Sequence, residues 1–117
     1  MEPIYDREGR VVAWQRGSYV YDLNGSHAGI LYGTYLYSCR GQHLGVFKDG
    51  LIWDNLGGVV AFVRSASGGP ELPVLSEPPD PPVPPAPPVP AVLSVPRVPA
   101  DLSPSWGQRE WEQFINA

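Results

Sequence analysis

Few residues of this chain are of the types that catalyse reactions or bind metals. The chain has two histidines, His27 and His43, and one cysteine, Cys39. Two imidazoles can bind Zn²⁺, Ni²⁺ or Cu²⁺, but a protein site normally needs three or four ligands. Asp22, Asp54 and Cys39 are the residues that could complete such a site. His27 and His43 remain a candidate metal pair, but we favour half-buried strand histidines and expect no metal or other cofactor.

The sequence also lacks the patterns of covalent and acid–base catalysis. It contains no Ser/His/Asp order, no P-loop and no GxGxxG motif. A nucleophilic Cys39 would need a general base placed by a recognisable motif, and none is present. The aspartates recur where turns recur, which indicates a structural role. We therefore predict that the chain is not an enzyme.

The element that positions these residues is a 16-residue repeat, present four times over about residues 3–66. An aromatic residue, an Asp or Ser, and a Gly recur at fixed places: Tyr5, Tyr21, Tyr37 and Trp53; Asp6, Asp22, Ser38 and Asp54; Gly9, Gly25, Gly41 and Gly57. Asp-x-x-Gly is typical of a type I turn followed by a left-handed glycine. Two-residue turns link the copies, at Gly17-Ser18, Gly33-Thr34 and Asp49-Gly50. Each copy is therefore predicted to be a β-hairpin.

Turns at both ends of each strand predict an up-and-down chain of eight short antiparallel strands. Four identical hairpins, each rotated by about 90°, close into a ring, and closure removes exposed strand edges. The predicted fold is all-β: a shallow closed up-and-down barrel with pseudo-four-fold symmetry. A ring of about 65 residues buries only about 60% of its unfolded surface, so we expect the tail or a second subunit to add burial.

Period-2 alternation predicts two faces of the ring. The predicted core takes three columns of the repeat: Ile4, Val20, Leu36 and Ile52; Val12, Ala28, Leu44 and Val60; Trp14, Ile30, Val46 and Phe62. The other face is predicted to carry the small residues Ala13, Gly29, Gly45 and Ala61, together with both histidines. Beside them we place a ligand- or tail-binding face formed by Tyr5, Tyr19, Tyr21, Tyr35, Tyr37 and Trp53.

Composition and charge exclude several function classes. Residues 1–66 carry six basic and six acidic side chains, and the whole chain has a net charge of −4. Nucleic-acid binding needs a basic excess, so we expect no nucleic-acid partner. One cysteine cannot form an internal disulfide. No apolar run is long enough to span a membrane and no signal peptide is recognisable, so we expect a cytoplasmic location, with signal-less export as the alternative.

Most of the 15 prolines lie from Pro70 onward, in a tail with a period of three residues. Polyproline II also has three residues per turn, so residues 78–101 are predicted to form such a rod, of which residues 78–99 could extend about 65 Å. Its period places the valines on one apolar ridge: Val83, Val89, Val92, Val95 and Val98, with Ala86 between. Aromatic grooves bind rods of this kind. We expect docking on the aromatic face of the same or a neighbouring subunit, with an exposed spacer as the alternative.

The end of the chain is predicted to be a short amphipathic helix. Ser103 resembles an N-cap, with Ser105-x-x-Gln108 as a capping-box alternative. Trp111, Phe114 and Ile115 share one helical face. About 12 residues are too few for a stable isolated helix, so we expect it to dock on the ring, with another protein as the alternative. The predicted organisation is a four-repeat β-ring domain at 1–66, a linker at 67–77, a polyproline II segment at 78–101, and the helix at 102–117.

The chain resembles a known bacterial family. The first copy, from Ile4 to Trp14, reads Ile-Tyr-Asp-x-x-Gly-Arg-Val-Val-Ala-Trp, and three echoes, Gly68-Gly69-Pro70, a Pro tract and a Trp-rich end follow. This pattern is similar to that of the four-fold β-flower domain proteins over the whole chain. The resemblance implies a shallow square β-barrel with no assigned activity and no catalytic residues. Its likeness to tubby-like and scramblase barrels implies membrane-surface association, which the absence of a basic surface or central hydrophobic helix argues against here.

Three functions are consistent with these features. The preferred one is a non-enzymatic structural or binding module whose aromatic face docks the Pro-rich tail, from the same chain or within a homo-oligomer. The second is a cup for a small apolar ligand or lipid, with the tail as its lid. The third is an adaptor whose tail recruits a protein partner. Exposure of the aromatic column distinguishes them.

Overall fold

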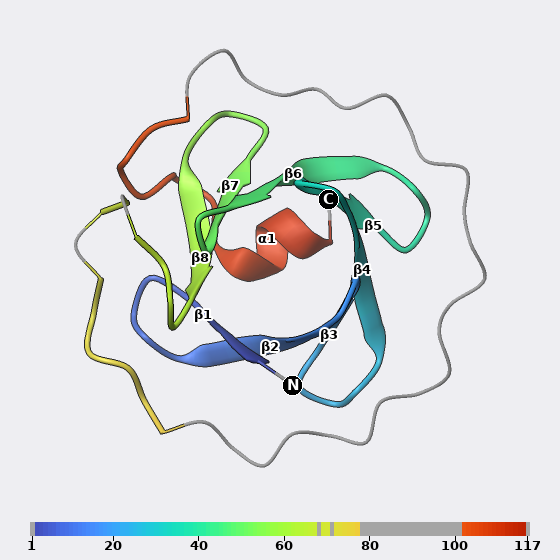
Figure 1. Ribbon diagram of the computed structural model, residues 1–117, viewed down its shortest axis with the longest axis horizontal. Helices are drawn as coiled ribbons and strands as arrows, with labels where there is room; N and C mark the ends of the chain where they lie inside the picture. The colour runs from blue at the N-terminus through green and yellow to red at the C-terminus, as the bar shows by residue number, and fades with distance from the viewer. Residues whose placement is uncertain (1, 68, 71, 78–101, 117) are drawn as a thin grey trace.

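The computed structural model describes residues 2–67, 69–70, 72–77 and 102–116, and their core is a closed eight-stranded barrel (Figure 1). Every neighbouring pair is antiparallel, and β1 pairs with β8 to close the ring. The strands are β1 (Glu2–Tyr5), β2 (Val11–Arg16), β3 (Tyr19–Tyr21), β4 (His27–Tyr32), β5 (Tyr35–Ser38), β6 (His43–Lys48), β7 (Leu51–Asp54) and β8 (Val59–Val63). The predicted up-and-down barrel is confirmed. We number its hairpins as repeats 1 to 4: residues 3–18, 19–34, 35–50 and 51–66.

The turn within each hairpin follows from the Asp-x-x-Gly pattern. In repeat 1 the Asp6 carboxylate accepts backbone N–H bonds from Glu8 (2.9 Å) and Arg10 (3.0 Å), and the N–H of Gly9 bonds to the Asp6 carbonyl (3.0 Å). Gly9 has a φ of 80°, which glycine adopts without a steric penalty. In repeat 3 the Ser38 hydroxyl replaces the carboxylate as acceptor. The predicted turns are therefore confirmed.

The predicted division into two faces was wrong for two columns of the repeat, those of Ala13 and Trp14, because each hairpin contains a β-bulge. Ile4 pairs with Ala13 and Tyr5 pairs with Val11, so Val12 is an extra residue in a β-bulge. The same register shift recurs in all four repeats. Directly paired residues share a face, so each small residue lies inside the barrel with its partner from the Ile4 column. Strict alternation cannot cross a bulge, because the extra residue reverses the order beyond it.

Beyond the bulge, Trp14 and its repeat equivalents share the outer face with the aromatic column. Trp14 pairs directly with Tyr21, and Val46 pairs with Trp53. The outer surface thus has its own apolar cluster of Tyr5, Val46, Leu51, Trp53, Val59 and Phe62. The barrel is therefore apolar on both sides, and its outer side also needs a cover.

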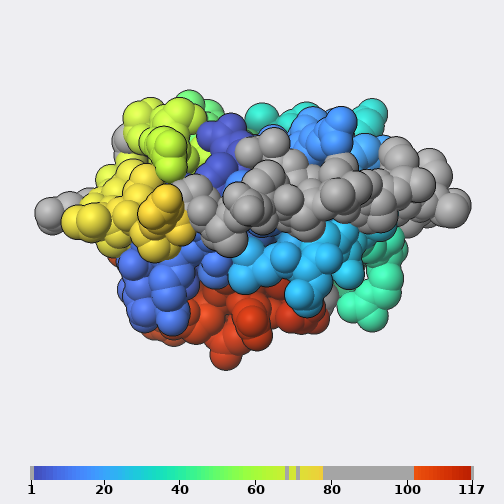
Figure 2. All heavy atoms as spheres, turned by 90° about the horizontal axis from the view of Figure 1, so that it is seen from below, coloured from blue at the N-terminus to red at the C-terminus, as the bar shows by residue number. Residues whose placement is uncertain are grey.

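The C-terminal helix α1 (Trp111–Ile115) closes one end of the barrel (Figures 1 and 2). Phe114 is fully buried, and Trp111 joins it in the inner cluster. A methyl group on Gly45 would lie 3.1 Å from the Phe114 ring and 1.9 Å from the carbonyl oxygen of Trp53. The small residues inside the barrel therefore leave room for the side chains of α1.

The helix is shorter than the sequence predicts, since it begins at Trp111 with Glu110 as its N-cap. Gln113 completes a capping box, because its side chain accepts the N–H of Glu110 (3.1 Å). The residues before it pair with β8 instead: Val59 donates its N–H to the carbonyl of Ser105 (3.0 Å), and Trp106 forms a parallel bridge with Val59. A backbone paired with a strand cannot also be helical, so Ser103 is not the N-cap. Within the described residues, none of the helices has the length and apolar character needed to cross a membrane.

Candidate binding site: the outer aromatic face

The outer aromatic face consists of Tyr5, Tyr21, Tyr37 and Trp53, one residue from each repeat. All four side chains are buried, with exposed fractions of 0%, 3%, 2% and 5%. Burial, with smaller contributions from neighbouring tyrosines, raises the pKa of Tyr37 above its usual value. The face is therefore dry and is not an open cup. Tyr19 and Tyr35, which the sequence places beside it, are half-buried on the same outer surface.

In repeat 4 the face contacts the segment that precedes α1. The indole Nε1 of Trp53 donates a 2.8 Å hydrogen bond to the carbonyl of Ser103. The N–H of Ser103 in turn bonds to the Gly57 carbonyl (2.8 Å), and the N–H of Gly107 bonds to the Val59 carbonyl (2.8 Å). Two further side chains pack on this end of the outer cluster, Leu102 and Trp106, and the ring of Trp106 lies 5.9 Å from that of Phe62.

Repeat 1 contacts the other described part of the tail. The N–H and the hydroxyl of Ser76 both donate to the Gly9 carbonyl, each at 2.9 Å. Leu72 and Leu75 pack on the outer cluster, whereas Val74 between them is 92% exposed. In Figure 2 this segment lies along the rim of the disc. Residues 72–77 therefore present their leucines to the barrel and Val74 to solvent.

The two histidines lie on the outer surface between tyrosines, and not on a face of small residues as predicted. The His43 ring is 5.7 Å from that of Tyr35 and 5.4 Å from that of Tyr37, and His27 has the same relation to Tyr19 and Tyr21. Burial lowers the pKa of His43, although a hydrogen bond with the Gly45 backbone opposes this shift. In the part of the chain that the structure describes, no three His, Cys, Asp or Glu side chains gather closely enough to hold a metal ion.

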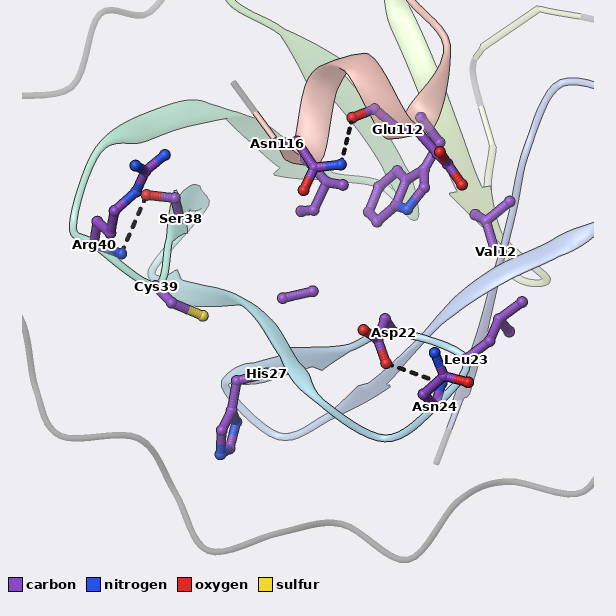
Figure 3. Close-up of a pocket in the computed structure, with 13 residues that line it drawn as sticks. Val12, Asp22, Leu23, Asn24, His27, Ser38, Cys39, Arg40, Glu112 and Asn116 are labelled. Atoms are coloured by element: carbon purple, nitrogen blue, oxygen red, sulfur yellow. Dashed lines mark hydrogen bonds between the residues drawn. The ribbon is translucent and has the colours of Figure 1, made fainter.

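A second feature, which the sequence analysis missed, is a cleft of about 510 Å³ at the end of the barrel that α1 closes (Figure 3). The turns of repeats 2 and 3 form two of its walls and α1 forms the third. Its lining mixes polar and apolar side chains: Val12, Asp22, Leu23, Asn24, His27, Ala28, Ser38, Cys39, Arg40, Trp111, Glu112, Ile115 and Asn116. Only the docked position of α1 creates it, so no local sequence signal could have found it.

The chemistry available in this cleft is hydrogen bonding and packing. Several of its polar groups already serve local structure: the Asp22 carboxylate accepts the N–H of Asn24, and the Ser38 hydroxyl accepts the N–H of Arg40. Burial raises the pKa of the Cys39 thiol, which reduces its thiolate content at neutral pH. Its surroundings therefore do not activate Cys39 as a nucleophile.

The architecture, the repeat and the position of α1 can be compared with known proteins. A family model described as "4-fold beta flower protein" matches residues 2–115. The chain belongs to this 4-fold beta flower family. The match extends past the barrel to α1, so the tail and the helix are part of the family pattern. No curated protein and no solved structure matches the chain. The family description names a shape and no activity, so function has to be argued from the residues of this beta flower protein.

The predicted site residues fall into three groups in the structure. The six residues of the aromatic face lie together on the outer surface. Trp111, Phe114 and Ile115 lie together inside one end of the barrel, against residues such as Gly29 and Gly45. The tail ridge of Val83, Val89, Val92, Val95 and Val98 lies outside the described residues, as does the whole predicted polyproline II segment at 78–101.

Proposed function

We propose that this protein is a non-enzymatic structural and binding module whose outer aromatic face binds its own Pro-rich tail. The observation that carries the proposal is the Trp53–Ser103 hydrogen bond, because it joins the aromatic column directly to a tail carbonyl. An indole N–H in an apolar surrounding needs a partner, and this acceptor comes from 50 residues away in the sequence. The tail then acts as the cover that a small barrel with two apolar surfaces requires.

Burial of the four aromatic residues supports this function over the ligand cup. A cup for an apolar ligand would leave these rings accessible, whereas none is more than 5% exposed. The leucines of both described tail segments contribute to the same outer cluster. The tail surface that faces away from the barrel, which includes Val74, is where an adaptor function would reside.

The cleft beside α1 favours ligand binding as a second candidate function. It lies at the one end where the turns of repeats 2 and 3 and the helix leave an open space of about 510 Å³, which is large enough for a small metabolite or a short peptide end. A native mass spectrum of the freshly purified protein tests this candidate, because a co-purified small molecule adds its mass to the chain.

A pair of adjacent substitutions in the full-length chain tests tail binding. Leu75→Asp places a charge in the outer cluster, whereas Val74→Asp alters an exposed side chain one residue away. We expect Leu75→Asp to destabilise the protein by about 1–3 kcal/mol, lowering its melting temperature by about 4–12 °C. It should also increase the fluorescence of the apolar dye ANS. Val74→Asp should do neither.

The proposal is wrong if the two variants melt together at the wild-type temperature. Strong ANS binding by the wild-type protein would also contradict it and would favour the ligand cup. Removing the whole tail is a poorer test, because that deletion also removes Phe114 from the barrel core.

A further inference from the structure

The two described tail segments make the same backbone contact with two different repeats. In repeat 1 the Gly9 carbonyl accepts the N–H of Ser76 (2.9 Å), and in repeat 4 the Gly57 carbonyl accepts the N–H of Ser103 (2.8 Å). Gly9 and Gly57 occupy the same column of the 16-residue repeat. Each serine follows a leucine, and both leucines pack on the outer cluster. The barrel thus recognises a Leu-Ser dipeptide at two symmetry-related places.

The spacing of these dipeptides matches the symmetry of the barrel. Repeats 1 and 4 adjoin each other where the ring closes, and the path between them through repeats 2 and 3 has three steps. Ser76 and Ser103 are 27 residues apart, which gives nine residues per repeat along that path. The tail sequence has this period of nine. A third Leu-Ser, Leu93-Ser94, stands nine residues before Leu102-Ser103. Nine residues before Leu93-Ser94 stand Pro84-Pro85, so this position of the period has two prolines in place of Leu-Ser.

The dimensions agree with this spacing. Nine residues are three turns of polyproline II, the conformation predicted from the Pro triplets, so every ninth residue returns to the same side of the rod. They extend about 28 Å. The molecule measures 36 × 35 Å across its broad face, and a quarter of the circumference of such a disc is also about 28 Å. One step along the tail therefore equals one step around the barrel.

We propose that the outer surface of repeat 3, at Tyr37 and the Gly41 carbonyl, binds the Leu93-Ser94 dipeptide of the same chain. By the same register, repeat 2 binds Pro84-Pro85. Proline has no N–H, so Pro85 cannot donate to the Gly25 carbonyl the backbone hydrogen bond that serine donates in the other repeats. The inference rests on the proposed function and adds its register, one nine-residue unit of tail per hairpin.

This register also decides which side of the tail meets the barrel. Leu75 packs on the outer cluster, whereas the neighbouring Val74 is 92% exposed. Val83 and Val92 stand nine and 18 residues after Val74 and so have the same position in the nine-residue period. The side that carries leucine and proline is therefore the binding side. The valine ridge predicted from the sequence is directed to solvent in this register, which is the opposite of the orientation that the ridge by itself suggests.

Two measurements on the full-length protein test the register. The first is hydrogen exchange of single amides by NMR: the Ser94 amide should exchange at least about tenfold more slowly than those of Val92 and Val95, as the Ser76 and Ser103 amides should relative to their neighbours. The second is thermal unfolding of Leu93→Asp with Val92→Asp as its matched control. We expect Leu93→Asp to lower the melting temperature by about 4 °C or more and Val92→Asp by less than about 1 °C.

The outcomes separate this inference from the proposed function. If Leu75→Asp destabilises the protein but Leu93→Asp does not, the tail binds and the nine-residue register is wrong. Destabilisation by Val92→Asp alone would also overturn the register and would restore the valine ridge as the binding side. If protection of Ser94 appears only with dimer formation at high concentration, the occupant is the tail of a second copy, which overturns binding within one chain.

Discussion

Removing the Phe114 side chain tests whether α1 is part of the barrel core. The ring is fully buried, and it meets the inner cluster formed by residues such as Ile4, Leu36 and Ile52. A Phe→Ala change at a buried site costs about 3–5 kcal/mol, from lost transfer energy and the remaining cavity. That is a large part of the total stability of a small domain, which is about 5–15 kcal/mol.

For a domain of this size, about 4 °C in melting temperature corresponds to 1 kcal/mol, so we expect Phe114→Ala to melt about 12–20 °C below the wild-type protein. Differential scanning calorimetry of the full-length chain measures this shift. Glu112→Ala is the matched control, because it alters an exposed side chain of the same helix and should change stability by no more than about 0.5 kcal/mol. If the two variants melt within about 2 °C of each other, α1 is not a core element and the reasoning fails.

Three further predictions follow from single contacts. Trp53→Phe and Trp14→Phe both remove a buried indole. The N–H of Trp53 donates to the Ser103 carbonyl, whereas the N–H of Trp14 has no partner among the described residues. Urea unfolding should therefore show Trp53→Phe to be more destabilising than Trp14→Phe by about 1 kcal/mol, and equal losses of stability would contradict this. Gly45→Ala would bring a methyl group within 1.9 Å of a backbone oxygen, so we expect a loss of more than about 2 kcal/mol or a protein that does not fold, as read by circular dichroism; a wild-type melting curve would refute it. Burial lowers the pKa of His43 in the folded protein below its unfolded value of about 6.5. As the pH falls below that value, the unfolded state takes up a proton that the folded state does not, so His43 reduces the free energy of unfolding in acid and not at higher pH. Melting curves from pH 7.5 to 5.0 should therefore show a smaller acid-induced fall in melting temperature for His43→Val than for the wild-type protein.

Part of the fold follows from local residue chemistry, and that part was predictable. Asp6 and Gly9 form a turn through their own carboxylate and their own φ angle, without help from the rest of the chain. Repetition of that turn, and of the linking turns such as Asp49-Gly50, determines eight antiparallel strands. A constant rotation per hairpin then leads to closure. The identity of the aromatic column, Tyr5 to Trp53, is also contained in the repeat.

The tertiary structure decided where those residues lie. An extra residue such as Val12 reverses the inside and outside of a strand, and whether a strand carries a bulge depends on its partner across the ladder. Residues 102–107 are not helical because Gly57 and Val59 take up their backbone hydrogen bonds, although their own sequence resembles the start of a helix. The cleft exists only because α1 inserts Phe114 where Gly45 leaves space. The sequence by itself thus determines the turns, the strand count and the chemistry available, whereas pairing and packing across distant segments determine which side of each strand is covered and by what.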